Sequence, residues 1–194
     1  MQEDMKKLIA YSSVAHMGFV TLGIFTFNKQ GLDGAVFQMI SHGLISGALF
    51  LSIGVLYERT HTRDINMFGD YASKMPKFCV FLMIITLGSV GLPGTSGFIG
   101  EILVLLGVWS VNPLVTITAG LSLILGAIYM LRFYRKIAFG KENKNNAVVL
   151  KEINLREYML FLPLSFLIIL FGIFPNLILS FFINPHSYII NSIN

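Results

Sequence analysis

The sequence predicts an all-α polytopic membrane protein with about five transmembrane helices, the third of them broken at Gly91–Gly94. Hydrophobic residues make up 55% of the 194 residues and charged residues only 12%, a composition typical of helical membrane proteins. Several apolar segments also reach the roughly 20 residues that an α-helix needs to cross a bilayer. We see no internal repeat and no soluble domain, so residues 1–194 are expected to form a single transmembrane domain.

Apolar runs and polar connections place the five spans in order. They cover about Leu8–Phe27, Gly34–Tyr57, Phe78–Val111, Leu114–Leu131 and Tyr158–Ile183. A charged loop, from Glu58 to Lys77, follows the second span, and the polar segment from Lys141 to Glu157 is the longest connection. Pro175 is expected to kink or end the fifth span.

The third span is predicted to be a discontinuous helix. Its 34 residues would form a helix about 50 Å long, whereas the hydrocarbon core is roughly 30 Å thick. The sequence Gly91-Leu92-Pro93-Gly94 lies near its middle. Broken backbone at membrane depth is tolerated only inside protein or beside a water-filled cavity. We therefore expect Gly91, Pro93 and Gly94 to form a break that faces an ion path.

The basic residues predict the topology. With five spans, thirteen of the fourteen Lys and Arg residues fall on one side of the membrane, and Lys29 is the exception. The positive-inside rule makes that side, which carries the N-terminus, cytoplasmic in a bacterium or the matrix side in a mitochondrion. The positive charge thus has a topological cause, and no nucleic-acid partner is expected.

Glu101 carries the sharpest chemical signal. A carboxylate near the bilayer centre costs about 2.5–3.5 kcal/mol on insertion scales, so such a group usually faces a bundle interior and serves a pathway. Burial favours its neutral form, whereas a position just after the break, near a helix N-terminus, favours its anion. This competition suits a proton carrier. The alternative is a neutral acid that satisfies unpaired backbone at the break.

His16 and His42 lie inside the first and second spans and are the other groups there that titrate near neutral pH. A single histidine in an apolar helix is more often a packed core residue than part of a relay. Together with Glu101, however, the two histidines place three titratable groups on three consecutive spans, which favours a proton relay. Metal binding is not expected, because no pair has ligand spacing on one helix and no Cys is nearby.

Smaller polar residues accompany the two histidines. Ser12, Ser13, Ser41 and Ser46 can hold water between titratable groups, although helix packing is the simpler interpretation of each. Gly43 and Gly47 form a small-xxx-small pair that predicts a closely packed neighbouring helix. Tyr129 falls near the end of a predicted span, as expected for an aromatic belt.

Four runs of residues resemble a known family. In chain order they are Lys6–Phe19 (KKLIAYSSVAHMGF), Ser41–Phe50 (SHGLISGALF), the loop Tyr57–Arg63 (YERTHTR) and Gly91–Glu101 (GLPGTSGFIGE). Together they resemble the C-terminal portion of the subunit M, or chain 4, family of NADH-quinone oxidoreductase, respiratory complex I. Related cation/proton antiporter subunits share the broken helix but match the Tyr57–Arg63 loop less well.

The resemblance implies a function for the site residues. Glu101 resembles the terminal proton-exchanging carboxylate of the family, His42 and His16 resemble polar residues of its midplane relay, and Gly91, Pro93 and Gly94 resemble the helix break. It implies that this chain translocates protons and carries no cofactor, while NADH, flavin, iron–sulfur clusters and quinone belong to partner subunits. Other membrane-arm subunits and the lipid bilayer are the expected partners. The bacterial inner membrane is the expected location, and the mitochondrial inner membrane is the alternative.

The family's N-terminal two thirds have no counterpart in this sequence. We therefore expect a split-gene product, a gene remnant or an excerpt of a longer chain, with the missing N-terminal part as a further partner. Two other functions stay open: a related cation/proton antiporter subunit, and a structural remnant without transport activity.

Overall fold

A computed structural model describes residues 2–141 and 151–181, and within these residues the regular structure is helical. The helices are α1 (Met5–Ile24), α2 (Lys29–Thr60), the 3-10 turn η1 (Ile65–Met67), α3 (Tyr71–Lys74), α4 (Pro76–Val90), α5 (Ser96–Trp109), α6 (Pro113–Phe139), α7 (Leu155–Ile173) and α8 (Asn176–Leu179). This confirms the all-α prediction. Four helices, α1, α2, α6 and α7, are long and apolar enough to cross a membrane, and α4 and α5 are shorter apolar helices.

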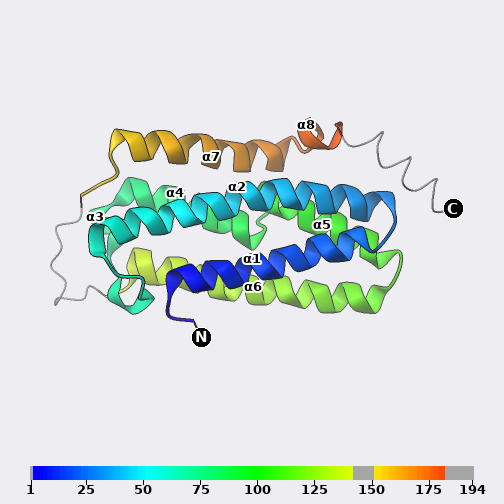
Figure 1. The fold of residues 1–194 in the computed structure, drawn as a ribbon, viewed down its shortest axis with the longest axis horizontal. Helices are drawn as coiled ribbons and strands as arrows, with labels where there is room; N and C mark the ends of the chain where they lie inside the picture. The colour runs from blue at the N-terminus through cyan, green and yellow to red at the C-terminus, as the bar shows by residue number, and fades with distance from the viewer. Residues whose placement is uncertain (1, 142–150, 182–194) are drawn as a thin grey trace.

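The helices form an elongated bundle in which the long helices run roughly side by side (Figure 1). α2 lies at the centre and packs most extensively on α5 and α1. α7 covers one side of α2 and α4, while α6 packs against α4 and α5. The short elements η1 and α3 lie together at one end of the bundle (Figure 1).

Local sequence signals explain where the helices begin. The side chains of Asp4, Asn28 and Asn112 accept hydrogen bonds from backbone N–H groups in the first turns of α1, α2 and α6, as N-cap residues do. α4 and α6 both have proline in the first turn, where its missing N–H costs nothing. Asn154 and Glu157 form a reciprocal capping box at the start of α7.

The predicted break in the third span is confirmed, because α4 ends at Val90 and α5 begins at Ser96. α7, which corresponds to the predicted fifth span, ends at Ile173, shortly before Pro175. This agrees with the expectation that Pro175 kinks or ends that span. The span end predicted at Ile183 lies outside the described residues. The predicted fourth span was too short. α6 continues to Phe139 because Phe133, Ile137 and Ala138 are buried on one face of its charged last turns.

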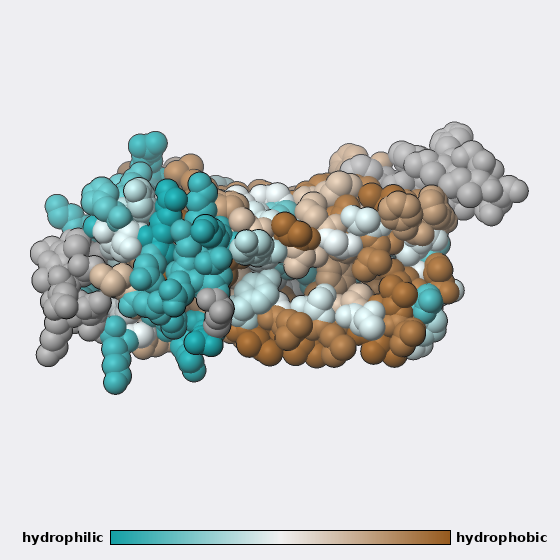
Figure 2. All heavy atoms as spheres, turned by 60° about the horizontal axis from the view of Figure 1, so that its bottom comes forward, coloured by the Kyte–Doolittle hydropathy of each residue, from teal (hydrophilic) through white to brown (hydrophobic). Residues whose placement is uncertain are grey.

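Charged and apolar residues separate along the bundle (Figure 2). At one end of the bundle, here called the basic end, α1, α4 and α7 begin, α2 and α6 end, and α3 lies beside them. The basic residues in or next to these segments are Lys6, Lys7, Arg59, Arg63, Lys74, Lys77, Arg132, Arg135, Lys136, Lys141, Lys151 and Arg156. The middle and the far end expose apolar side chains, among them Leu114, Ile117, Leu121, Ile124 and Leu125 on α6. This distribution is that of a bundle whose middle is surrounded by lipid.

The predicted close approach at Gly43 and Gly47 was wrong for the described part of the chain. A Cβ atom added at either glycine would meet nothing within 4 Å. Tight helix packing occurs instead where α2 meets α5. A Cβ at Gly34 would come within 2.6 Å of the Val104 nitrogen, and one at Gly107 within 2.5 Å of the Gly31 nitrogen. Glycines on α2 and α5 therefore allow the close approach that was predicted at Gly43 and Gly47.

Candidate functional site: a carboxylate–imidazole pair at a helix break

The break between α4 and α5 is a turn that satisfies part of its own backbone. Gly91 has φ 75° and caps α4, a left-handed conformation that glycine adopts without a steric penalty. The N–H groups of Gly91 and Leu92 donate to the carbonyl oxygens of Gly88 and Leu87. The Thr95 N–H and hydroxyl both donate to the Leu92 carbonyl oxygen. The turn thereby satisfies several of its own backbone groups; Leu92, Pro93 and Gly94 are exposed in the described structure, and burial begins at Thr95 and Ser96.

Glu101 is in the second turn of α5, directly beside this break. It is 3% exposed. Its Oε1 lies 2.9 Å from His16 Nδ1. Its Oε2 lies beside Gly91, so close that a Cβ atom added to this glycine would be 2.4 Å from the oxygen. Glycine at position 91 therefore makes room for the carboxyl group. The His16 side chain is 13% exposed, so the pair is shielded from solvent, and its nitrogen and oxygen atoms lie at hydrogen-bond distance.

His42 completes a group of three titratable residues from three helices. Its ring centroid lies 5.6 Å from that of His16. The structure thus brings together all three residues that the sequence selected as a possible relay, and the sequence also placed the break beside Glu101. Among the described residues, no cluster of three or more His, Cys, Asp or Glu side chains is arranged to hold a metal ion.

Hydroxyl groups surround the histidines on the side of the basic end. The Tyr129 hydroxyl donates to Ser12 Oγ at 3.0 Å, and Ser13 Oγ lies 3.3 Å from Ser46 Oγ. Tyr129 was predicted to lie near the end of a span, as in an aromatic belt. The structure extends α6 ten residues past it, and its half-buried side chain directs the hydroxyl group at Ser12 on α1. The signal that could have identified it is the phenol itself, which needs a partner when it is buried.

Gln38 is a second polar residue that the sequence reasoning missed. It is 2% exposed, and its Oε1 has no hydrogen-bond partner in the described structure. It lies one turn before His42 on α2 and packs against Gly100, the residue before Glu101. A glutamine four residues before a histidine in an apolar span is the signal that could have found it.

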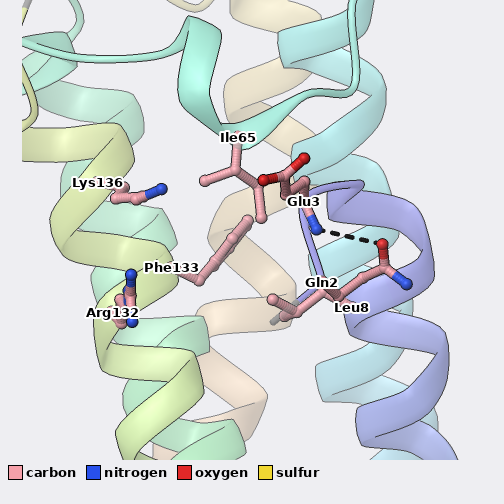
Figure 3. Close-up of a pocket in the computed structure, with 7 residues that line it drawn as sticks. All are labelled: Gln2, Glu3, Leu8, Ile65, Arg132, Phe133 and Lys136. Atoms are coloured by element: carbon pink, nitrogen blue, oxygen red, sulfur yellow. Dashed lines mark hydrogen bonds between the residues drawn. The ribbon is translucent and has the colours of Figure 1, made fainter.

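A pocket opens near the start of α1, at the basic end of the bundle (Figure 3). Arg132 and Lys136 on α6 lie at one edge, and Gln2 and Glu3 lie at the other. Phe133 and Ile65 point into the space between them. A second pocket, of about 280 Å³, continues along α1 and is lined by Gln2, Leu8, Tyr11, Ser12, Ala15 and Tyr129. The two pockets share Gln2 and Leu8.

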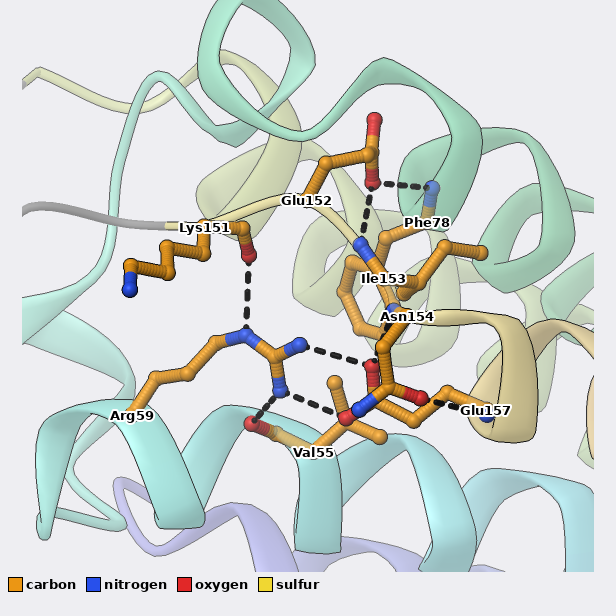
Figure 4. A network of polar contacts seen from close by, with 8 residues as sticks. All are labelled: Val55, Arg59, Phe78, Lys151, Glu152, Ile153, Asn154 and Glu157. Carbon is orange, nitrogen blue, oxygen red and sulfur yellow. Dashed lines mark hydrogen bonds and ion pairs between the residues drawn. The ribbon is translucent and has the colours of Figure 1, made fainter.

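Arg59 and Glu157 form a polar network that closes the basic end between α2 and α7 (Figure 4). The guanidinium group donates to both carboxylate oxygens of Glu157, at 2.8 and 2.7 Å. It also donates to the carbonyl oxygens of Val55 and Lys151. The sequence had placed both residues in polar connections. They lie instead in the last turn of α2 and the first turn of α7, where their helices extend beyond the apolar segments.

The fold and the site define a polytopic helical membrane protein with a discontinuous helix and a buried carboxylate–imidazole pair beside the break. The sequence profile of the transmembrane family described as NADH:quinone oxidoreductase/Mrp antiporter matches residues 1–128. The chain belongs to this family.

Individual relatives agree with the family assignment. The NADH-quinone oxidoreductase subunit M of Rickettsia bellii is 53% identical over 181 residues, which are 93% of this chain and 37% of that protein. A chain of respiratory complex I from Thermus thermophilus with bound NADH is 34% identical and superposes with a TM-score of 0.84, over 98% of this chain and 39% of that chain. The Mrp complex from Dietzia sp. shares the fold at a TM-score of 0.82 and 18% identity, over 97% of this chain and 44% of that chain. The chain therefore spans little more than a third of the length of the subunit M relative.

Proposed function

We propose that this chain is the proton-exchanging, C-terminal part of a subunit M of NADH-quinone oxidoreductase, a single transmembrane domain that moves protons while NADH oxidation and quinone reduction take place in other subunits. The observation that carries the proposal is the buried contact between His16 and Glu101 beside the helix break. An intramembrane ionisable pair is expensive to bury and is expected to serve an ion pathway.

The geometry supports a specific proton movement. With one proton, the His16–Glu101 pair is either an imidazolium beside a carboxylate or a neutral imidazole beside a carboxylic acid. A proton added to His42 would place a second positive charge near His16, because the two ring centroids are 5.6 Å apart. Two positive charges at that distance repel by about 3 kcal/mol at an effective dielectric constant of about 20. A proton arriving on His42 therefore favours transfer of the proton from His16 to Glu101, and its departure allows the reverse.

The proposal includes the surroundings of the chain. NADH, flavin, iron–sulfur clusters and quinone belong to partner subunits. The neighbours of this chain are other membrane-arm subunits, the preceding part of the same subunit and lipid. The basic end is cytoplasmic, in a bacterial inner membrane, by the positive-inside rule. Mass spectrometry of the intact NADH-oxidising complex from membranes is the test of these partners. A complex that contains neither this chain nor a longer chain with these residues would contradict the assignment.

Substitution of Glu101 tests the proton function. In inverted membrane vesicles, NADH-driven acidification is measured together with NADH oxidation. Glu101→Gln keeps the size of the side chain but cannot ionise, so proton transport per NADH is expected to fall strongly. Glu101→Asp keeps the carboxyl group and is expected to be milder. Transport that both variants leave unchanged would favour a structural role, with Glu101 as a buried neutral acid.

A cation/proton antiporter is the second candidate, because the Mrp complex shares this fold. The two functions differ in what drives transport. An antiporter exchanges Na⁺ for protons across vesicles without NADH, whereas the complex I function requires NADH oxidation. Na⁺-dependent proton exchange in vesicles without NADH, lost in Glu101→Gln, would favour the antiporter.

A further inference from the structure

Two hydroxyl groups in the core of the bundle, those of Thr86 on α4 and Ser165 on α7, have no hydrogen-bond partner in the described structure. The two residues are 1% and 4% exposed, so neither hydroxyl group is solvated from outside the bundle. Buried polar groups in native proteins are nearly always hydrogen-bonded, to protein or to ordered water. The two groups therefore point to a hydrogen-bonding partner between the helices.

Other hydroxyl groups on the helices bond to their own backbone. Thr21, Ser52 and Thr60 each donate to the carbonyl oxygen four residues earlier, at 3.2, 2.8 and 2.8 Å. This back-bonding satisfies a serine or threonine inside a helix without any neighbour. Thr86 and Ser165 do not use it, so their hydroxyl groups are turned away from the carbonyl oxygens of their own helices.

The buried residues of α7 form one stripe along the helix. Beyond the first turn they follow one another at intervals of three or four residues, which places their side chains on one face. They are Phe161, Ser165, Ile168 and Gly172. Because α7 contacts α2, α4 and α5, this is the face that turns towards those helices.

Two contacts set the register of this stripe on α4. Phe161 stacks on the Phe81 ring, with the centroids 5.7 Å apart. Ile168 Cγ2 lies beside Gly88, 3.0 Å from where a Cβ atom of this glycine would be. Both helices begin at the basic end and run in the same direction. Ser165 lies between the two contacts on α7, and Thr86 lies between them on α4, so the two residues are at the same height in the bundle.

We propose that one buried water molecule links Thr86 Oγ1 to Ser165 Oγ and ties α7 to α4. Each hydroxyl group can donate one hydrogen bond and accept others, and a carbonyl oxygen of the same helical turns can accept a further bond. These groups meet the need of a buried water for two to four polar partners. The fully buried Phe161 and Ile168 hold the helices apart, so the shorter side chain of Ser165 leaves space beside it.

The site does not depend on the proposed function, because it concerns how the helix before the break is held in place. α7 already contacts the break itself: a Cβ atom at Gly172 would be 2.4 Å from the Gly94 carbonyl oxygen. The water adds a polar contact with α4, nearer to the basic end. α7 thus supports the broken helix both at the turn and before it.

A density map of the assembled complex, at a resolution that shows ordered water, tests the site directly. The expected result is a peak at about 2.5–3.0 Å from both hydroxyl oxygens, the usual length of a hydrogen bond between oxygen atoms. No peak, a peak beside only one of the two oxygens, or direct contact between Thr86 Oγ1 and Ser165 Oγ would overturn the proposal.

A double-mutant cycle tests the link in solution. Thr86→Val, which keeps the shape of the side chain, and Ser165→Ala are made singly and together in the assembled complex. The measurement is the temperature at which the detergent-solubilised complex loses its intact band on a native gel. Each single variant is expected to lower it, because the water and the remaining hydroxyl group lose a partner. The double variant is expected to lower it no further than the larger single shift, because both ends of the link are then apolar.

Ser52→Ala is the matched control. Ser52 is 1% exposed, and its hydroxyl group donates to the Ala48 carbonyl oxygen of its own helix. The shifts of Ser52→Ala and Thr86→Val are expected to add in their double variant. Additive shifts in the Thr86→Val, Ser165→Ala pair as well would overturn the link. Neither measurement uses proton transport, so the water site can fail while the proposed function stands, and loss of the proposed function in the Glu101→Gln test leaves the site intact.

Discussion

Arg59 at the end of α2 and Glu157 at the start of α7 form a bidentate ion pair, with nitrogen–oxygen distances of 2.8 and 2.7 Å. Their side chains are only 14% and 10% exposed. Loss of one partner leaves the other charge buried and unpaired, which is strongly destabilising. Arg59→Ala is therefore expected to lower the stability of the bundle by about 2–4 kcal/mol, with Glu157→Gln milder because it keeps a hydrogen-bonding side chain.

The measurement is the temperature at which the detergent-solubilised complex loses its intact band on a native gel. Arg63→Ala is the matched control, since Arg63 is exposed and stacks over the Tyr57 ring at 5.0 Å. It is expected to shift that temperature little. Equal shifts in Arg59→Ala and Arg63→Ala would show that the ion pair contributes no more than an exposed side chain.

The contact between His16 and Glu101 predicts that the two residues act as one unit in transport. His16→Gln and Glu101→Gln are each expected to reduce NADH-driven proton transport strongly. The double variant is expected to lose little more than the stronger single variant, because groups that work together give non-additive losses. His61→Asn, at the exposed left-handed cap of α2, serves as the control. Losses that multiply in the double variant would mean that the two residues act independently.

Much of this site could be predicted from the sequence because its elements are costly inside a membrane. Glu101, His16 and His42 interrupt apolar spans, so each was expected to face the bundle interior. Gly91–Gly94 breaks a segment too long for one helix, and the structure leaves Leu92–Gly94 exposed. The 2.9 Å contact itself joins residues 85 positions apart and depends on how α1 packs against α5. The pairing of Tyr129 with Ser12 depends likewise on the packing of α6 against α1. The extension of α6 to Phe139 was missed because Arg132, Arg135 and Lys136 obscured the buried stripe of Phe133 and Ile137.

The position of the Glu101 carboxyl group predicts different effects at the two left-handed glycines of the break. Gly91 and Gly94 have φ values of 75° and 92°, so alanine at either costs about 1–2 kcal/mol of backbone strain. A Cβ at Gly91 would also meet Glu101 Oε2 at 2.4 Å, whereas a Cβ at Gly94 would meet nothing within 4 Å. Gly91→Ala is therefore expected to reduce proton transport per assembled complex, and Gly94→Ala to reduce stability alone. Equal transport per assembled complex in both variants would contradict the placement of the carboxyl group.

The close approach of α2 and α5 predicts which glycines of α2 tolerate a methyl group. A Cβ at Gly34 would lie 2.6 Å from the Val104 nitrogen and 2.8 Å from the Leu103 Cβ. Overpacking of this kind costs about 1–3 kcal/mol, and the helices must separate because the first of these contacts is with backbone. Gly34→Ala is thus expected to reduce the amount of assembled complex in membranes. Gly47→Ala, on the same helix with open space around the added atom, is the control, and it is expected to assemble normally. Normal assembly and thermal stability of Gly34→Ala would show that α2 and α5 separate at no cost.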